Sequence, residues 1–71
     1  MNLNMSNDID VLKTIIKTRE LDNVLIKVGS SYHVVYMSSC DLGDGEYVYN
    51  IDAYSLSFHI DEIDAWLILG E

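Results

Sequence analysis

The sequence predicts an α+β fold in which one N-terminal amphipathic helix packs on a small antiparallel sheet of four or five strands. Three observations favour it. Apolar residues recur at helical spacing near the N-terminus, they alternate from about residue 23 onward, and short turns rich in Gly and Asp interrupt the alternation. A chain of 71 residues is expected to form a single domain spanning 1–71.

The helix is expected at about residues 7–20. Its apolar positions are three and four residues apart, which places Ile9, Leu12, Ile15 and Ile16 on one face. Ser6 or Asn7 is expected to cap its first turn. Acids near the start and bases near the end match the helix dipole.

Strands are expected at about 23–28, 32–38, 46–51, 54–60 and 65–69. The first two are separated by Gly29-Ser30-Ser31, and Asp44-Gly45 is a strong hairpin signal, because both turns need positive φ angles. The apolar parity flips around Asp52-Ala53, which requires a bulge or a turn there. Residues 61–69 fit either a short helix or a last strand, and the strand is preferred.

The distribution of charge is more informative than the net charge of −8. Up to Lys27, four acids balance four bases, whereas the remaining 44 residues carry eight acids and neither Lys nor Arg. Such a surface repels nucleic acid and anionic lipid, and it attracts a basic protein surface. We therefore expect no direct nucleic-acid binding. The alternative is that the acidity only keeps a small protein soluble.

Catalytic and metal-binding functions have little support in the sequence. His33, Cys40 and His59 lack the spacing of a catalytic set or of a zinc site. The acidic turn departs from a calcium loop because its sixth position, counted from Asp41, is Glu46 instead of glycine. We expect no enzyme activity, no cofactor and no dedicated metal site.

Recognition of a protein surface remains, and the candidate partner-binding residues are the acids after Lys27 with two neighbouring tyrosines. Tyrosine suits such a surface because it offers a large contact area at low entropic cost. The predicted set is Asp41, Asp44, Glu46, Asp52, Asp61, Glu62, Asp64, Tyr47 and Tyr49.

These features favour a small acidic inhibitor that blocks a basic nucleic-acid-binding site of a host defence or nucleic-acid enzyme. Carboxylates on one face of a strand are about 6.6 Å apart, close to the roughly 7 Å between neighbouring phosphates, so the protein would act as a DNA mimic. In size, acidity and order of elements the chain resembles small phage or mobile-element proteins of the anti-CRISPR and anti-restriction type. The expected partner is a nuclease, a CRISPR effector, a polymerase or a toxin.

Two alternatives stay open, an immunity protein or antitoxin that neutralises a basic toxin, and a homo-oligomeric accessory protein such as a homodimer. A single cysteine, a start unlike a signal peptide and the lack of an apolar run of about 18 residues predict a cytoplasmic protein without a membrane segment.

Overall fold

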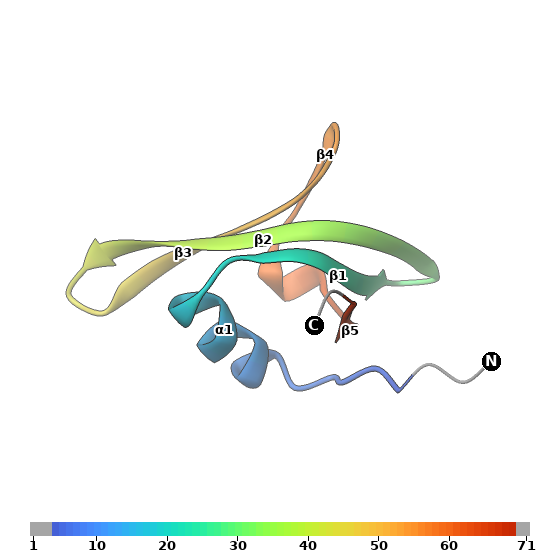
Figure 1. Ribbon diagram of the computed structural model, residues 1–71, viewed down its shortest axis with the longest axis horizontal. Coiled ribbons are helices and arrows are strands. Elements are labelled where there is room, and N and C mark those ends of the chain that lie inside the picture. Colours follow the sequence, from blue (N-terminus) through green and yellow to red (C-terminus); the bar gives the residue numbers. More distant parts are fainter. Residues whose placement is uncertain (1–3, 70–71) are drawn as a thin grey trace.

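A computed structural model describes residues 4–69, which form an α-helix, a short 3₁₀ helix and a five-stranded sheet (Figure 1). The elements in chain order are α1 (Ile9–Thr18), β1 (Leu21–Val28), β2 (Ser31–Gly43), β3 (Glu46–Ala53), β4 (Leu56–Phe58), the 3₁₀ helix η1 (Ile60–Glu62) and β5 (Ala65–Ile68). All neighbouring strands are antiparallel, in the order β4-β3-β2-β1-β5. The predicted α+β fold, with an N-terminal helix on an antiparallel sheet, is confirmed.

Helix α1 is shorter than predicted, and its cap is a different residue. Asp8 is the N-cap, and its carboxylate accepts a hydrogen bond from the backbone N–H of Val11 at 3.1 Å. Ser6, one of the two predicted caps, instead accepts a hydrogen bond from the backbone N–H of Asp8. The helix ends where Arg19 adopts an extended conformation.

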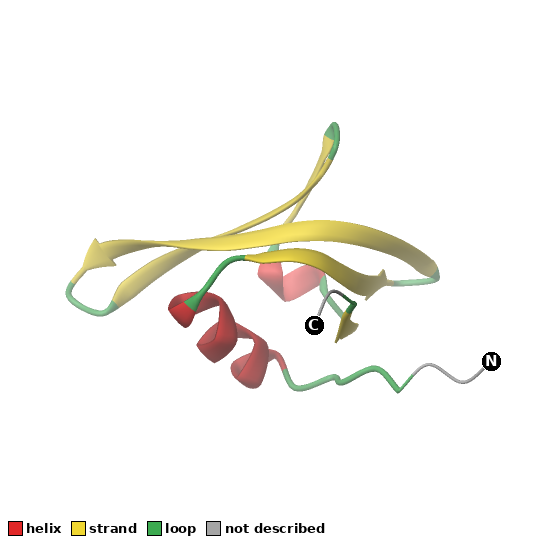
Figure 2. Cartoon of the chain, viewed as in Figure 1, coloured by secondary structure: helices red, strands yellow, loops and turns green. Residues whose placement is uncertain are grey.

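The core lies between the sheet and the layer formed by α1 and η1, which are on the same side of the sheet (Figure 2). Leu12 and Ile16 are one helical turn apart and fully or almost fully buried. They belong to one cluster of buried apolar side chains with Val24, Ile26, Val35, Met37, Ile51 and Trp66 among others. No polar or charged residue is buried among residues 4–69, so the core is held by apolar burial.

Two-residue turns connect the first four strands. In the β2–β3 turn both Asp44 and Gly45 have positive φ, as a tight hairpin turn requires. The hairpin predicted from Asp44-Gly45 is therefore confirmed. The β1–β2 turn begins with Gly29 at positive φ. The third turn explains the parity flip, since Ala53 pairs with Leu56 and Tyr54-Ser55 forms the turn between β3 and β4.

Two predicted strands are wrong in extent. The second strand does not end near residue 38, because β2 continues to Gly43 by pairing with β3 after it leaves β1. The strand predicted at 54–60 is only Leu56–Phe58, and it is followed by η1. The last element is the preferred strand, which pairs with β1, and its other side is bridged at Trp66 by Ser6.

Candidate functional site

A two-stranded ribbon extends beyond the rest of the sheet. β1 pairs with β2 only as far as Met37, and β4 pairs with β3 only from Ile51 to Ala53. Residues 38–50 therefore pair only with each other, and we call them the arm. It is the green and yellow hairpin that projects past α1 in Figure 1. Its strands are six and five residues long, which corresponds to about 20 Å.

The tip of the arm holds three of the predicted acids. Gly43 pairs with Glu46 and Asp41 with Tyr47, so Asp41, Asp44 and Glu46 all lie at one end of the ribbon. All three are exposed, and no Lys side chain among residues 4–69 forms an ion pair with them. The Asp41 carboxylate accepts a hydrogen bond from the backbone N–H of Gly43 at 2.8 Å, which fixes its position at the turn.

An exposed apolar side chain lies among these carboxylates. Leu42 is 62% exposed, and it occupies the register shift between Asp41 and Gly43. A bulge of this kind bends a ribbon and re-aims a side chain. The tip therefore combines three negative charges with one apolar group.

Tyr47 and Tyr49, the two predicted tyrosines, lie on the side of the arm that faces α1. Their rings are 6.5 Å apart and nearly parallel, and each is half-buried. The Nζ atom of Lys17 is 4.9 Å from the ring centroid of Tyr47, and that of Lys13 is 5.8 Å from the ring centroid of Tyr49. The fold thus brings two bases from the neutral N-terminal part onto the acidic part, with favourable cation–π contacts.

A shallow hollow lies beside these tyrosines. It has a volume of about 340 Å³ and lies between α1, β3 and the start of η1, with Lys13, Tyr47, Tyr49 and Asp61 in its lining. Asp61 is 3.7 Å from Nδ1 of His59, and both side chains are largely exposed. The hollow brings Asp61 close to the base of the arm.

Three other predicted acids make local hydrogen bonds outside the arm. Glu62 accepts a hydrogen bond from the backbone N–H of His59 at 3.1 Å and caps η1. Asp64 accepts one from the backbone N–H of Gly29 at 2.7 Å, and Asp52 accepts one from the hydroxyl of Ser57 at 2.8 Å.

The predicted acids consequently do not form one continuous surface. Asp64 lies at the β1–β2 turn, at the opposite end of β2 from the arm tip. Twelve strand steps separate these two ends of β2, which corresponds to about 40 Å. The arm tip gathers three of the predicted acids, and Asp61, Glu62 and Asp64 form a second group at η1 and just after it.

The predicted site leaves out a group of residues on the sheet face that α1 does not cover, which we call the open face. Tyr32, Val34 and Tyr36 alternate along β2 on this face, and they are 54%, 51% and 37% exposed. The signal was present in the sequence, because five of the six residues at 32–37 are apolar or aromatic and a single helix covers only one face.

Two acids of the N-terminal part lie beside Tyr36 on the open face. Hydrogen bonding to Glu20 raises the pKa of the Tyr36 phenol above its usual value of 10.0. Desolvation and the negative charges of Glu20 and Asp22 act in the same direction. Asp52 is the cross-strand partner of Tyr36 on the other side.

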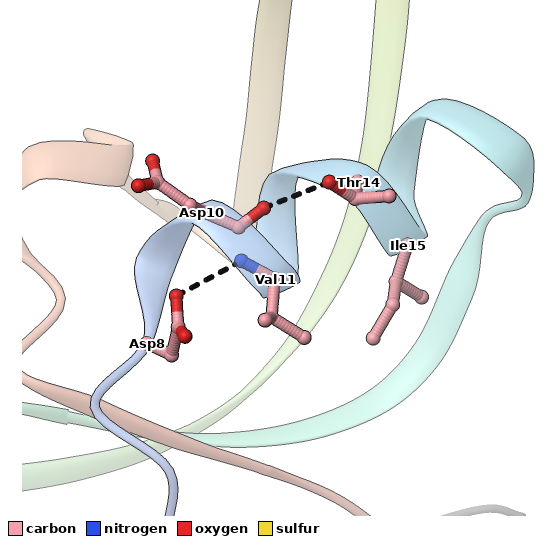
Figure 3. A pocket seen from close by; sticks show the side chains of 5 residues that line it. All are labelled: Asp8, Asp10, Val11, Thr14 and Ile15. Atoms are coloured by element: carbon pink, nitrogen blue, oxygen red, sulfur yellow. Dashed lines mark hydrogen bonds between the residues drawn. The ribbon is translucent and has the colours of Figure 1, made fainter.

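A second hollow, of about 330 Å³, lies against α1 (Figure 3). Two of its polar side chains are used by the helix itself. Asp8 caps the backbone N–H of Val11, and the Thr14 hydroxyl donates to the carbonyl of Asp10 at 2.9 Å. Val11 and Ile15 supply its apolar lining, and the arrangement is that of the first turns of a helix.

The side chains considered for catalysis have different surroundings. The His33 ring packs on Phe58 at a centroid distance of 4.7 Å, Cys40 is a free, exposed thiol on the arm, and His59 precedes η1. Within the described part of the chain, no group of three or more His, Cys, Asp or Glu side chains is arranged to hold a metal ion. None of the helices formed by residues 4–69 has the length and apolar character needed to cross a bilayer.

No protein-family model, curated protein or solved structure matches this chain.

Proposed function

We propose that this protein binds a basic surface of another protein through the tip of the arm and thereby blocks a nucleic-acid-binding site. The observation that carries the proposal is the group formed by Asp41, Asp44 and Glu46, which are exposed together at the end of a projecting ribbon. Carboxylates concentrated on a projection create a local negative potential, which steers a cationic partner toward that point.

The shape of the arm suits entry into a groove. A two-stranded ribbon fits into the major groove of DNA, so the ribbon is narrower than the DNA duplex itself. A protein groove that admits a nucleic acid therefore has room for the arm. Leu42 adds an apolar contact that nucleic-acid phosphates lack, and such a central apolar anchor surrounded by polar groups is typical of tight protein interfaces.

The partner expected from this chemistry is a host nuclease, a CRISPR effector, a restriction enzyme or a polymerase, and the inhibitor would be encoded by a phage or mobile element. Tyr47 and Tyr49 support the arm from the side of α1 in this proposal, because Lys13 and Lys17 cover their rings. Asp61, near the base of the arm, is the second acid we expect to face the partner.

The experiment is affinity capture from the lysate of a host cell at low and high salt, with the wild type and with the variant Asp41→Asn, Asp44→Asn, Glu46→Gln. The amides keep the shape of the side chains and remove three charges. We expect the wild type to capture a basic nucleic-acid-binding protein at about 50 mM salt and to release it at about 500 mM, since screening shortens the range of charge interactions. The variant should capture much less.

A control variant separates the arm from net charge. Asp10→Asn, Glu20→Gln, Asp22→Asn removes the same number of charges from exposed positions outside the arm. It should keep most of the binding. Equal capture by the wild type and the arm variant at low salt would contradict the proposal, and a captured toxin in place of a nucleic-acid enzyme would favour the immunity-protein alternative.

A further inference from the structure

The open face has the composition of a contact surface. In an antiparallel sheet with one face on the core, the other face usually carries polar side chains. Here Tyr32, Val34 and Tyr36 lie outward along the centre of the sheet, each more than a third exposed. Exposed apolar side chains that adjoin one another in this way mark interaction sites in stable proteins.

The apolar character continues across the neighbouring strands. Val34 pairs with Leu25 of β1, and Leu25 pairs with Leu67 of β5, so the three side chains form a row across the sheet. Leu25 and Leu67 are half-buried within the single chain. Helices α1 and η1 lie on the other side of the sheet, so no helix of the described residues covers this row (Figure 1).

The two ends of the open face differ in charge. Lys27 is the cross-strand partner of Tyr32 at one end, and Asp64 lies beyond it at the β1–β2 turn, where its carboxylate accepts a hydrogen bond from the backbone N–H of Gly29. Asp52 pairs with Tyr36 at the other end, where Glu20 and Asp22 also lie. Tyr32 and Tyr36 are four strand steps apart, which corresponds to about 13 Å.

We infer that the open face binds a second copy of this chain in a two-fold symmetric dimer. The two-fold axis lies between the two open faces at Val34. It runs parallel to both sheets and perpendicular to the strands, so the strands of one copy run opposite to those of the other. Lys27 of each copy then lies over the acids around Tyr36 of its partner, and the rows of Val34, Leu25 and Leu67 pack on each other. The surface is therefore self-complementary, as an isologous contact must be.

The available area predicts a weak dimer. Four strands at about 4.8 Å spacing and a length of about 20 Å along the strands give a footprint of about 400 Å² per copy. Protruding side chains make the accessible surface larger than this flat footprint. The two copies together therefore bury about 1,000 Å² of accessible surface, the lower limit for a specific interface. We expect dimers at several hundred micromolar and monomers at a few micromolar.

Salt distinguishes this contact from the one proposed for the arm. Each copy carries a net charge of −8, so two copies repel each other, and salt screens that repulsion. Added salt should thus strengthen the dimer, whereas it should weaken binding of a basic partner. The dimer does not depend on the proposed function of the arm, and either contact can exist without the other.

The test is sedimentation equilibrium of the full chain from about 5 µM to about 1 mM, with two matched variants. Val34→Glu places a charge at the centre of the open face, and Val11→Glu places one on α1, where the valine is 46% exposed compared with 51% for Val34. The wild type and Val11→Glu should dimerise alike, and Val34→Glu should raise the dissociation constant at least about tenfold, because it buries two like charges against each other. Circular dichroism checks that each variant is folded.

A charge exchange tests the orientation of the two copies. Lys27→Glu should weaken the dimer, and adding Asp22→Lys to it should restore most of the loss, since the charges on the two ends are then swapped. A wild type that stays monomeric at 1 mM, or a dimer that Val34→Glu leaves unchanged, would overturn the inference. Loss of dimer in Lys27→Glu without rescue by Asp22→Lys would overturn the antiparallel arrangement.

Discussion

Two adjacent valines of β2 provide a direct test of which sheet face is buried. Val35 is 2% exposed and belongs to the core, whereas Val34 is 51% exposed on the open face. Truncation to alanine removes the same atoms from both positions. At Val35 the lost burial amounts to about 1.6 kcal/mol at about 0.8 kcal/mol per methylene equivalent, and the cavity raises the cost to about 2–3 kcal/mol. At Val34 half of the side chain is in water already, so the cost is below about 1 kcal/mol.

The losses are large relative to the stability expected of a chain of this size. A domain of 71 residues has about 4–10 kcal/mol of unfolding free energy. A loss of 1 kcal/mol lowers Tm by about 4–8 °C in small domains, so Val35→Ala should lower Tm by roughly 10–20 °C and Val34→Ala by less than about 8 °C.

Urea unfolding at a few micromolar, followed by the fluorescence of Trp66, measures both variants in the monomer. Trp66 is a suitable probe because it is buried and its indole N–H donates to the carbonyl of Asp8 at 3.0 Å. Equal destabilisation by the two substitutions, or a larger loss for Val34→Ala, would refute the assignment of the faces and with it the open face as a contact surface.

Two further predictions concern charged groups outside the arm. Asp64→Ala should cost about 1 kcal/mol of stability without a change in partner capture, because Asp64 holds the Gly29 turn; urea unfolding measures the loss, and an unchanged midpoint would contradict that role. The pKa of Tyr36 is raised by its hydrogen bond to Glu20, so its contribution to stability is complete below pH 10.0 and is lost as the pH rises through the folded pKa. The unfolding free energy should therefore fall less steeply above pH 10.0 in Tyr36→Phe than in the wild type, and parallel curves would contradict this linkage.

The helix and the tight turns could be predicted, because each depends on residues that are neighbours in the sequence. Asp44-Gly45 has the turn chemistry of a tight hairpin, and the period of Leu12 and Ile16 is that of a helix with one buried face. The parity flip near Ala53 correctly indicated a break in the strand. In each case a few neighbouring residues carry the physical constraint.

The length of β2 could not be predicted because it depends on a distant partner. Residues 38–43 include Asp41 and Gly43, which have low strand propensity, and this segment becomes a strand by pairing with β3. Hydrogen bonding of the Ser39 hydroxyl to the carbonyl of Ile16 also fixes this segment against α1. Tertiary contacts of this kind have no local signature.

For the candidate site, the sequence located the acids but could not show how they group. The arm tip gathers three of them because they are close along the chain, whereas Asp64 lies at the far end of the sheet. The lysines over Tyr47 and Tyr49 come from α1, so their position depends on helix packing and not on the spacing of residues. Charge counted along the chain therefore overstated how negative that side of the arm is.

Electrostatic steering by the arm tip can be measured as the salt dependence of the association rate between this protein and the partner that it captures. If the carboxylates of Asp41, Asp44 and Glu46 steer a cationic surface, the rate for the wild type should fall at least about tenfold from about 50 to 500 mM salt. The arm variant should be slow at low salt and show a much flatter dependence. Identical rates and salt slopes for the wild type and the arm variant would contradict the claim.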